Sequence, residues 1–215
     1  MLQSAIINAA LELEVWIGLD DDDTSEYHDA IDGAFANGAD VFVQRMPRRS
    51  LSSWTNLLTE RCLAADGAPA YLVSLGDDHV PRTASWDLLL VKAISELEGP
   101  GFAYGNDLLQ GSELPTAWMA SAAAVRALGW MMLPQCDHMY VDNVIMTLGQ
   151  QAGRISYVPG VIIEHVHPNA GKAPMDDLYA QSNAVMQYRR DGAAYEAWRD
   201  GQLARDADTL SSLKH

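Results

Sequence analysis

The hydrophobic positions in the first half of the chain follow two alternating patterns. Residues 2–13 carry apolar side chains at helical spacing, and the short apolar run over 14–19 predicts a strand. The same order then repeats, with helices predicted over 25–38 and 51–65 and strands over 39–46 and 71–75. Because this alternation is typical of α/β domains, we expect a mostly parallel central sheet in which 15–19, 40–43 and 70–75 are neighbours.

The second half of the chain continues the same kind of pattern. Helices are predicted from a cap at Thr83 or Ser85 to Leu97, and then over 122–128 and 137–153. Strands are predicted over 102–105, 116–120, 155–158 and 161–163. The region 175–208 is typical of an amphipathic helical tail packed on the body. We therefore expect one domain over residues 1–215.

Acidic and imidazole side chains follow several of the predicted strands. Asp20, Asp21, Asp22 and Asp23 follow strand 14–19, the run Asp77, Asp78, His79 follows strand 71–75, and His165 and His167 end strand 161–163. In open α/β sheets the carboxyl ends of the strands border the ligand crevice. Oxygen ligands with an imidazole suit Mg²⁺ or Mn²⁺. A solvated acidic turn explains residues 77–79 equally well, and helix capping explains part of the aspartate run.

Charge and composition limit the classes of function. The chain has 215 residues, 48% of them hydrophobic, with 14 Lys and Arg against 29 Asp and Glu, so the net charge is −15. This charge argues against a general grip on nucleic acid and favours a cation site. Arg45, Arg48 and Arg49 concentrate positive charge after strand 39–46, which suits a phosphate, although a surface loop explains at least one of them.

Targeting and redox signals are weak in this sequence. The longest apolar runs are too short for a bilayer, and the start of the chain lacks the features of a signal peptide. Cys62 and Cys136 show neither a CxxC motif nor zinc-ligand spacing, which indicates buried thiols. We therefore expect a cytoplasmic protein without a membrane partner.

The order of these motifs resembles the metal-dependent nucleotide-sugar glycosyltransferases of the GT-A fold, in particular their family-2-like inverting enzymes, over about residues 14–168. In that family a divalent ion, held at a DxD turn, contacts the sugar diphosphate. The resemblance implies Mn²⁺ or Mg²⁺ at Asp78, with His79 and either His165 or His167. It also implies that a nucleotide-diphosphate-sugar donor contacts a second set of charged residues, which are Asp20, Asp21, Asp22, Arg45, Arg48, Arg49 and Asp77.

The resemblance also implies a catalytic carboxylate. In the family this residue opens a helix and is followed by a glycine eleven residues later, and Asp142 and Gly153 match that spacing. Asp142 is therefore the expected general base, with Asp137 as the second candidate. The sequence departs from the family in three places: His79 replaces the last carboxylate of the metal motif, Val141 replaces a Glu, and the usual first strand is not found before residue 2.

The function that the resemblance implies is transfer of a sugar, with inversion, to a hydroxyl of an acceptor. Modified DNA bases, proteins and glycans are candidate acceptors, because compact domains of this family resemble those encoded by bacteriophages, whose gene products act in the host cytoplasm. Two other classes of function stay open. One is a metal-dependent phosphohydrolase or nuclease that uses the same aspartates, and the other is a non-catalytic module that binds nucleotide sugars.

Overall fold

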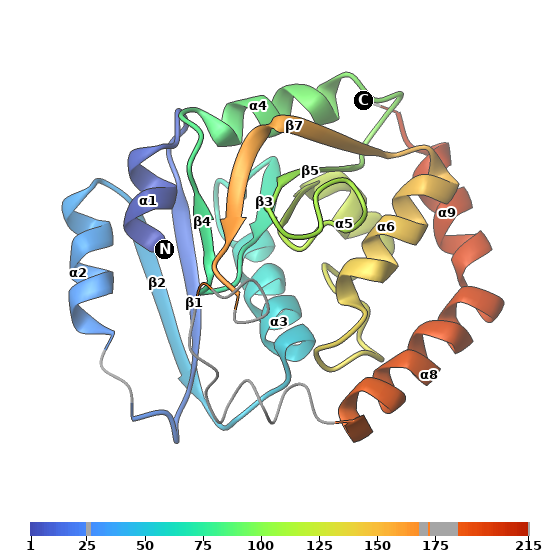
Figure 1. Ribbon diagram of the computed structural model, residues 1–215, viewed down its shortest axis with the longest axis horizontal. Coiled ribbons are helices and arrows are strands. Elements are labelled where there is room, and N and C mark those ends of the chain that lie inside the picture. The colour runs from blue at the N-terminus through green and yellow to red at the C-terminus, as the bar shows by residue number, and fades with distance from the viewer. Residues whose placement is uncertain (25–26, 168–171, 173–184, 215) are drawn as a thin grey trace.

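The computed structural model describes residues 1–24, 27–167, 172 and 185–214, and its described strands form two sheets (Figure 1). The smaller sheet pairs β1 (Glu14–Asp20) in parallel with β2 (Asp40–Met46). The larger sheet has the order β3-β6-β5-β7-β4. Its strands are β3 (Tyr71–Ser74), β4 (His79–Pro81), β5 (Phe102–Asn106), β6 (Trp118–Ser121) and β7 (Ile155–His165).

The α/β class is confirmed, but the predicted strand order is wrong. β3 pairs with β6 and lies in a different sheet from β1 and β2. Among the described strands only β1–β2 and β5–β7 pair in parallel, while β3–β6, β5–β6 and β4–β7 are antiparallel, so the expected mostly parallel sheet is also wrong. The reason is local. Residues 107–117 join β5 to β6 without a helix, so this pair lacks the long crossover that parallel pairing needs.

Helices cover both faces of the five-stranded sheet because its side chains alternate between two cores. Phe102 and Tyr104 pack in a cluster with α5 (Ala122–Leu128), α6 (Val141–Ala152) and α9 (Leu203–Ser212). Ala103, between them in sequence, packs with α4 (Trp86–Ser95) and α1 (Leu2–Ile7) on the opposite face. This is the period-two alternation of a strand. It makes the strands β5 and β6 the rigid centre of the molecule.

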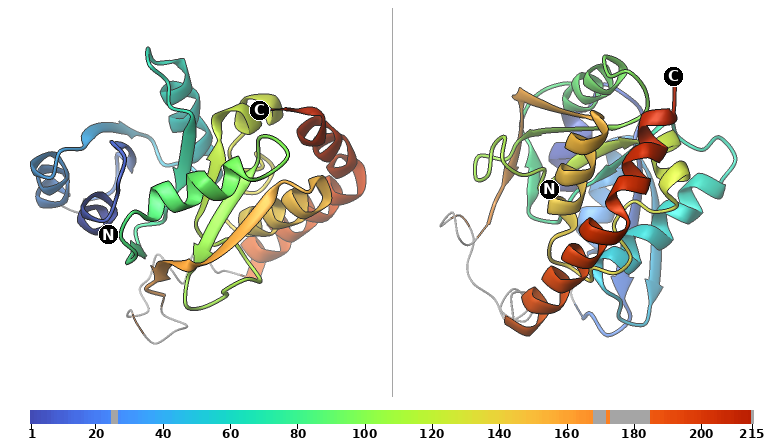
Figure 2. Two further views of the ribbon diagram at one scale, coloured as in Figure 1. Left: turned by 90° about the horizontal axis from the view of Figure 1, so that it is seen from above. Right: turned by 90° about the vertical axis from the view of Figure 1, so that its right-hand side faces the viewer.

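The two-stranded sheet is attached to the body through α3 (Leu51–Ala64). The ring of Trp54 lies so close to Gly18 of β1 that an added Cβ would come within 2.6 Å of it. Ser50 caps α3 by accepting a hydrogen bond from the Ser53 N–H at 3.3 Å. Together with α2 (His28–Ala36), this sheet occupies one end of the molecule, opposite α8 (Val185–Gly201) and α9 (Figures 1 and 2).

Several predicted boundaries shift in the structure. The first helix ends at Ile7 rather than near residue 13, and the helix predicted from residue 137 begins at Val141. Ser85 occupies the predicted N-cap position of α4 but makes no side-chain cap bond, and the Thr83 hydroxyl bridges Gly160 and Ile162 of β7. The predicted strands 155–158 and 161–163 form one strand.

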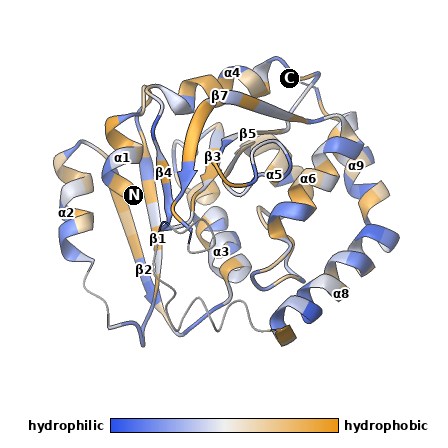
Figure 3. Cartoon of the chain, in the orientation of Figure 1, coloured by the Kyte–Doolittle hydropathy of each residue, from blue (hydrophilic) through white to orange (hydrophobic). Residues whose placement is uncertain are grey.

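The C-terminal tail is helical where it is described. It consists of α8 and α9, and most residues of α8 are hydrophilic (Figure 3). Residues 175–184 of the predicted tail and Ser25 of the predicted second helix lie outside the described residues. In the described part of the chain, no helix combines the length and the apolar character that crossing a membrane would require.

Candidate functional site

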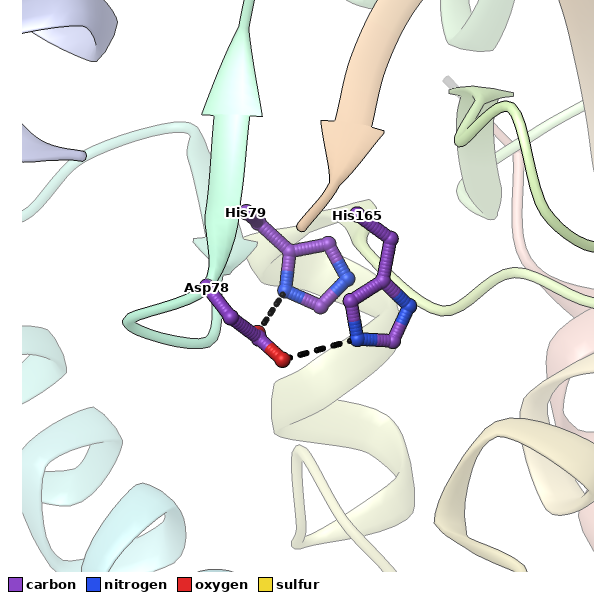
Figure 4. A group of neighbouring side chains, drawn as sticks. All are labelled: Asp78, His79 and His165. Carbon is purple, nitrogen blue, oxygen red and sulfur yellow. Dashed lines mark hydrogen bonds and ion pairs between the residues drawn. The ribbon is translucent and has the colours of Figure 1, made fainter. Parts of the chain in front are cut away.

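Asp78, His79 and His165 form a compact cluster where β4 and β7 pair (Figure 4). The antiparallel register places His79 opposite His165, and their rings stack with centroids 4.2 Å apart. The Asp78 carboxylate lies against both rings, with Oδ2 at 2.9 Å from His165 Nε2 and Oδ1 at 3.1 Å from His79 Nδ1. Asp78 and His79 are adjacent in sequence and His165 is distant from them, yet all three present oxygen or nitrogen atoms to one point.

The turn before β4 makes this cluster possible. The Gly76 N–H donates to His79 Nδ1 at 3.1 Å. A Cβ at position 76 would lie 2.7 Å from Asp78 Oδ1 and 2.8 Å from His79 Nδ1, so glycine is required there. This hydrogen bond uses the one lone pair of His79 Nδ1, so no N–H of that atom lies between it and the Asp78 Oδ1 atom 3.1 Å away. Two acceptors this close repel each other unless a proton or a cation lies between them.

The cluster strongly perturbs the titration of its members. Burial disfavours the charged form of His165, but the carboxylates of Asp107 and Asp78 outweigh burial and raise the pKa of His165 to about 9. Burial also opposes ionisation of Asp78, but the hydrogen bond with His165 and the adjacent imidazole of His79 hold the pKa of Asp78 far below the usual carboxyl range. Perturbed groups of this kind concentrate at functional sites, although structural ion pairs also produce them.

Asp107 is a site residue that the sequence analysis missed. It is buried, and Oδ2 lies 3.9 Å from His165 Nδ1. That distance is an ion-pair contact rather than a hydrogen bond, which agrees with the lack of a hydrogen-bond partner for His165 Nδ1 among the described groups. The carboxylate of Asp107 is fixed by the N–H groups of residues 109–111 at 2.7–2.9 Å and by the Thr116 hydroxyl at 2.9 Å. Its signal was the same as that of the other acids, a carboxylate just after a strand.

Asp142 lies in the first turn of α6, as predicted. Its Oδ1 accepts a hydrogen bond from the Asn143 N–H at 2.9 Å. Burial raises the pKa of Asp142, while the charges of His165 and His79 act in the opposite direction, so this carboxylate is within electrostatic reach of the cluster. Asp137, the second candidate base, instead forms an ion pair with Arg190 at 2.6 Å.

The residues predicted to contact the nucleotide form a second group, at the ends of β1 and β2. Asp20 accepts hydrogen bonds from the Trp54 indole N–H at 2.8 Å and from the Arg49 N–H at 3.1 Å. Arg48 bridges Asp20 at 3.3 Å and Asp22 at 3.0 Å. Arg45 donates to the carbonyl of Asp20 at 3.0 Å. The predicted acids and arginines therefore do come together, but they pair with one another.

The remaining predicted site residues lie at the margins of these two groups. Asp21 is exposed, and its N–H donates to the Met46 carbonyl at 2.8 Å. Asp77 is exposed on the turn before Asp78. The ring of His167 lies edge-on to His165 with centroids 4.7 Å apart. Burial and the neighbouring His165 charge lower the pKa of His167.

Comparison with known proteins supports the fold. No protein-family model matches the sequence, and no curated protein matches it either. Glucosyl-3-phosphoglycerate synthase from Mycobacterium tuberculosis, solved with Mn²⁺, uridine diphosphate and phosphoglyceric acid, aligns with a TM-score of 0.58 and 18% identity over 93% of this chain and 74% of that chain. The same enzyme, solved with Mn²⁺, uridine diphosphate and glucosyl-3-phosphoglycerate, aligns with a TM-score of 0.56 and 19% identity over 89% of this chain and 75% of that chain.

A third solved structure, a mycobacterial protein, gives a TM-score of 0.57 and 16% identity over 91% of this chain and 69% of that chain. At these identities the likeness establishes a shared fold. The expected GT-A-like architecture of the chain is therefore confirmed.

Proposed function

We propose that this protein transfers a sugar from a nucleotide-diphosphate sugar to a hydroxyl group of an acceptor, with the help of a divalent metal ion. The observation that carries the proposal is the Asp78–His79–His165 cluster, within electrostatic reach of Asp142, in a fold shared with an enzyme solved with Mn²⁺ and uridine diphosphate. Neither rival class of function accounts for both the cluster and the carboxylate at the start of α6.

The cluster fits a divalent metal ion. One ligand atom from each of Asp78, His79 and His165 lies within 4.8 Å of the others. The carboxylate suits Mn²⁺ or Mg²⁺, and the two imidazoles favour Mn²⁺ of the two. Asp78 and His165 would hold the ion, with His79 as a third ligand if its ring rotates away from Gly76, and His167 as the alternative to His165. A bound ion neutralises the charge that develops on the diphosphate leaving group.

The nucleotide would lie between this cluster and the charged group at the ends of β1 and β2. The Arg48 side chain is 54% exposed, so it can exchange an aspartate partner for a phosphate oxygen without unfolding its surroundings. The Arg45 guanidinium donates to the Asp20 carbonyl, and Arg49 contacts Asp20 through its backbone N–H, so both residues lie at the same end of this sheet and would share the phosphate charge. We assign Asp20, Asp21 and Asp22 to the nucleobase side and Asp77 to the diphosphate side of the donor.

Asp142 would supply the proton transfer that the reaction needs. Its raised pKa makes the carboxylate a better proton acceptor than an exposed aspartate. As the acceptor oxygen forms a bond to the anomeric carbon, its proton passes to Asp142 and the bond from that carbon to the diphosphate oxygen breaks. Attack on the face opposite the diphosphate inverts the anomeric configuration.

A screen of nucleotide sugars tests this function. Uridine-diphosphate sugars are tried first with Mn²⁺ or Mg²⁺, and phosphoglycerate, glycans, proteins and modified DNA serve as acceptors. We expect release of nucleoside diphosphate, and an inverted product anomer by NMR. Retention of configuration would remove the base role from Asp142 while leaving transfer intact. Release of phosphate from nucleotides without any sugar transfer would favour the phosphohydrolase. Binding without turnover of any donor would favour the non-catalytic module.

A further inference from the structure

A buried carboxylate of α8 holds the loop that leads into α6. Asp191 is fully buried, and its Oδ2 accepts hydrogen bonds from the backbone N–H groups of His138 at 2.9 Å and Met139 at 2.8 Å. Its Oδ1 accepts from the Asp137 N–H at 3.2 Å, and Gln187 donates to Oδ2 at 2.9 Å. One side chain therefore satisfies three consecutive N–H groups from a segment more than fifty residues earlier.

The loop ends in a strained residue that α8 also holds. Tyr140 has φ = 66°, a left-handed conformation that is costly for a residue with a side chain. Its ring packs against Gly192, where an added Cβ would come within 3.3 Å of it, and against Tyr188 and Tyr195. Helix α6 begins at the next residue, so the position of Asp142 depends on how this turn is held.

A second contact ties the same loop to α3. The Ser52 N–H donates to the Asp137 carbonyl at 3.2 Å. The Asp137 side chain, in turn, is paired with Arg190 of α8. The path of residues 137–140 is therefore set from two sides, with α3 at its start and α8 along its length.

We propose that Asp191 is a positioning residue for Asp142: its carboxylate sets the path of residues 137–140 and so aims the first turn of α6 at the reacting hydroxyl. This inference rests on the proposed function, because it takes Asp142 as the general base. It gives the C-terminal helices a role in catalysis beyond covering the core. A carboxylate that only stabilised the fold would have no selective effect on the step that uses Asp142.

The chain provides a matched control in Asp206 of α9. This carboxylate is also buried, and it accepts a hydrogen bond from the Trp198 indole N–H at 2.8 Å. Its partners lie within α8 and α9, away from residues 137–140. Asp206→Asn therefore measures the general cost of weakening a buried carboxylate in the C-terminal helices.

The test is a double-mutant cycle on the full-length chain. For Asp191→Asn we expect kcat to fall about tenfold or more with donor KM within about twofold, since misplacing a catalytic group lowers turnover rather than binding. In an Asp142→Asn background the same substitution should cause no further loss, because the group it positions is already inactive. Asp206→Asn should lower Tm and leave kcat unchanged. Hydrogen exchange at residues 137–139 should accelerate in Asp191→Asn alone.

Equal losses of kcat in both backgrounds, or a change in Tm without one in kcat, would overturn the inference. If Asp191→Asn does not fold, Asp191→Glu replaces it, since the longer side chain keeps the charge but moves the carboxylate away from its positions beside the N–H groups of His138 and Met139. An unchanged kcat in a folded Asp191→Glu variant whose residues 137–139 exchange faster would then overturn the inference. These outcomes differ from a failure of the proposed function, in which the parent enzyme itself would transfer no sugar from any donor.

Discussion

The two charged groups of this protein, one at the ends of β4 and β7 and one at the ends of β1 and β2, come from the same sequence signal but differ in what they leave unsatisfied. Around Asp78 two imidazoles and a carboxylate converge, no lysine or arginine pairs with them among the described residues, and His79 is only 5% exposed. Around Asp20 the acids meet arginines and a tryptophan N–H. Two nearly buried imidazoles beside a carboxylate can exchange the proton on His165 for a metal ion, whereas acids that are already paired with arginines must rearrange before the arginines bind a phosphate.

We expect the largest effect from a substitution in the group at the ends of β4 and β7. Asp78→Ala removes the carboxylate that contacts both imidazoles, so we expect sugar transfer to fall below detection at any Mn²⁺ concentration that supports the parent enzyme. Turnover of the best donor is the measurement, with Tm as the check on folding. Activity in a folded Asp78→Ala variant above one tenth of the parent value would place the metal elsewhere.

Asp142→Asn should have the next largest effect. The amide keeps the shape of the side chain and cannot accept the proton, so we expect transfer to fall about 100-fold or more while donor binding stays near normal. Burial raises the pKa of Asp142, and a base works only when ionised, so kcat of the parent enzyme should fall as the pH drops through that raised pKa. This acid limb should be absent from Asp142→Asn. A parent rate in the variant would move the base to another residue, and Asp137 would be examined first.

Asp107→Asn tests whether the Asp107 carboxylate helps His165 to bind a metal ion. A carboxylate behind a metal-binding imidazole fixes ring orientation and raises ligand basicity, so its loss typically costs about 10- to 100-fold in metal affinity. We expect the Mn²⁺ concentration for half-maximal turnover to rise by that factor, with little change in kcat at saturating Mn²⁺. An unchanged Mn²⁺ dependence would show that Asp107 serves only its own loop.

The smallest effect is expected in the exposed group. Arg48→Gln should raise donor KM only about three- to tenfold, because several arginines share the phosphate charge, and it should leave Tm unchanged, because exposed ion pairs contribute little. Arg199, an exposed arginine paired with Asp200 at 3.1 Å on α8, provides the control. If Arg48→Gln and Arg199→Gln behave alike, the group at the ends of β1 and β2 does not bind the donor.

The sequence predicted the elements better than their arrangement. Hydrophobic periodicity placed β1, β2, α3 and α5 to within about two residues, because each is decided by neighbours along the chain. The insertion of β6 between β3 and β5 is decided by pairing across the sheet, which periodicity does not record. The three-residue strand β4 was hidden in what reads as a turn with a proline.

For the candidate site, too, the sequence predicted the residues better than their arrangement. The acids and imidazoles were visible because they follow strands, and the structure does bring Asp78, His79 and His165 together. Asp107 also follows a strand but was not predicted as a site residue, because its role depends on the orientation of a ring 58 residues later. The start of α6, which separates Asp142 from Asp137, depends on hydrogen bonds to Asp191 in a helix that follows much later in the chain.

Direct measurement of metal binding tests the central claim, that Asp78 and His165 hold a divalent ion against the donor's diphosphate. Mn²⁺ is titrated calorimetrically into the full-length protein with and without uridine diphosphate. We predict about one Mn²⁺ per chain, weakly bound alone and much more tightly with the nucleotide, because few protein ligands leave the remaining positions to phosphate oxygens and water. This binding should disappear in Asp78→Ala. Equal Mn²⁺ affinity in the parent and in Asp78→Ala, with uridine diphosphate present, would contradict the account.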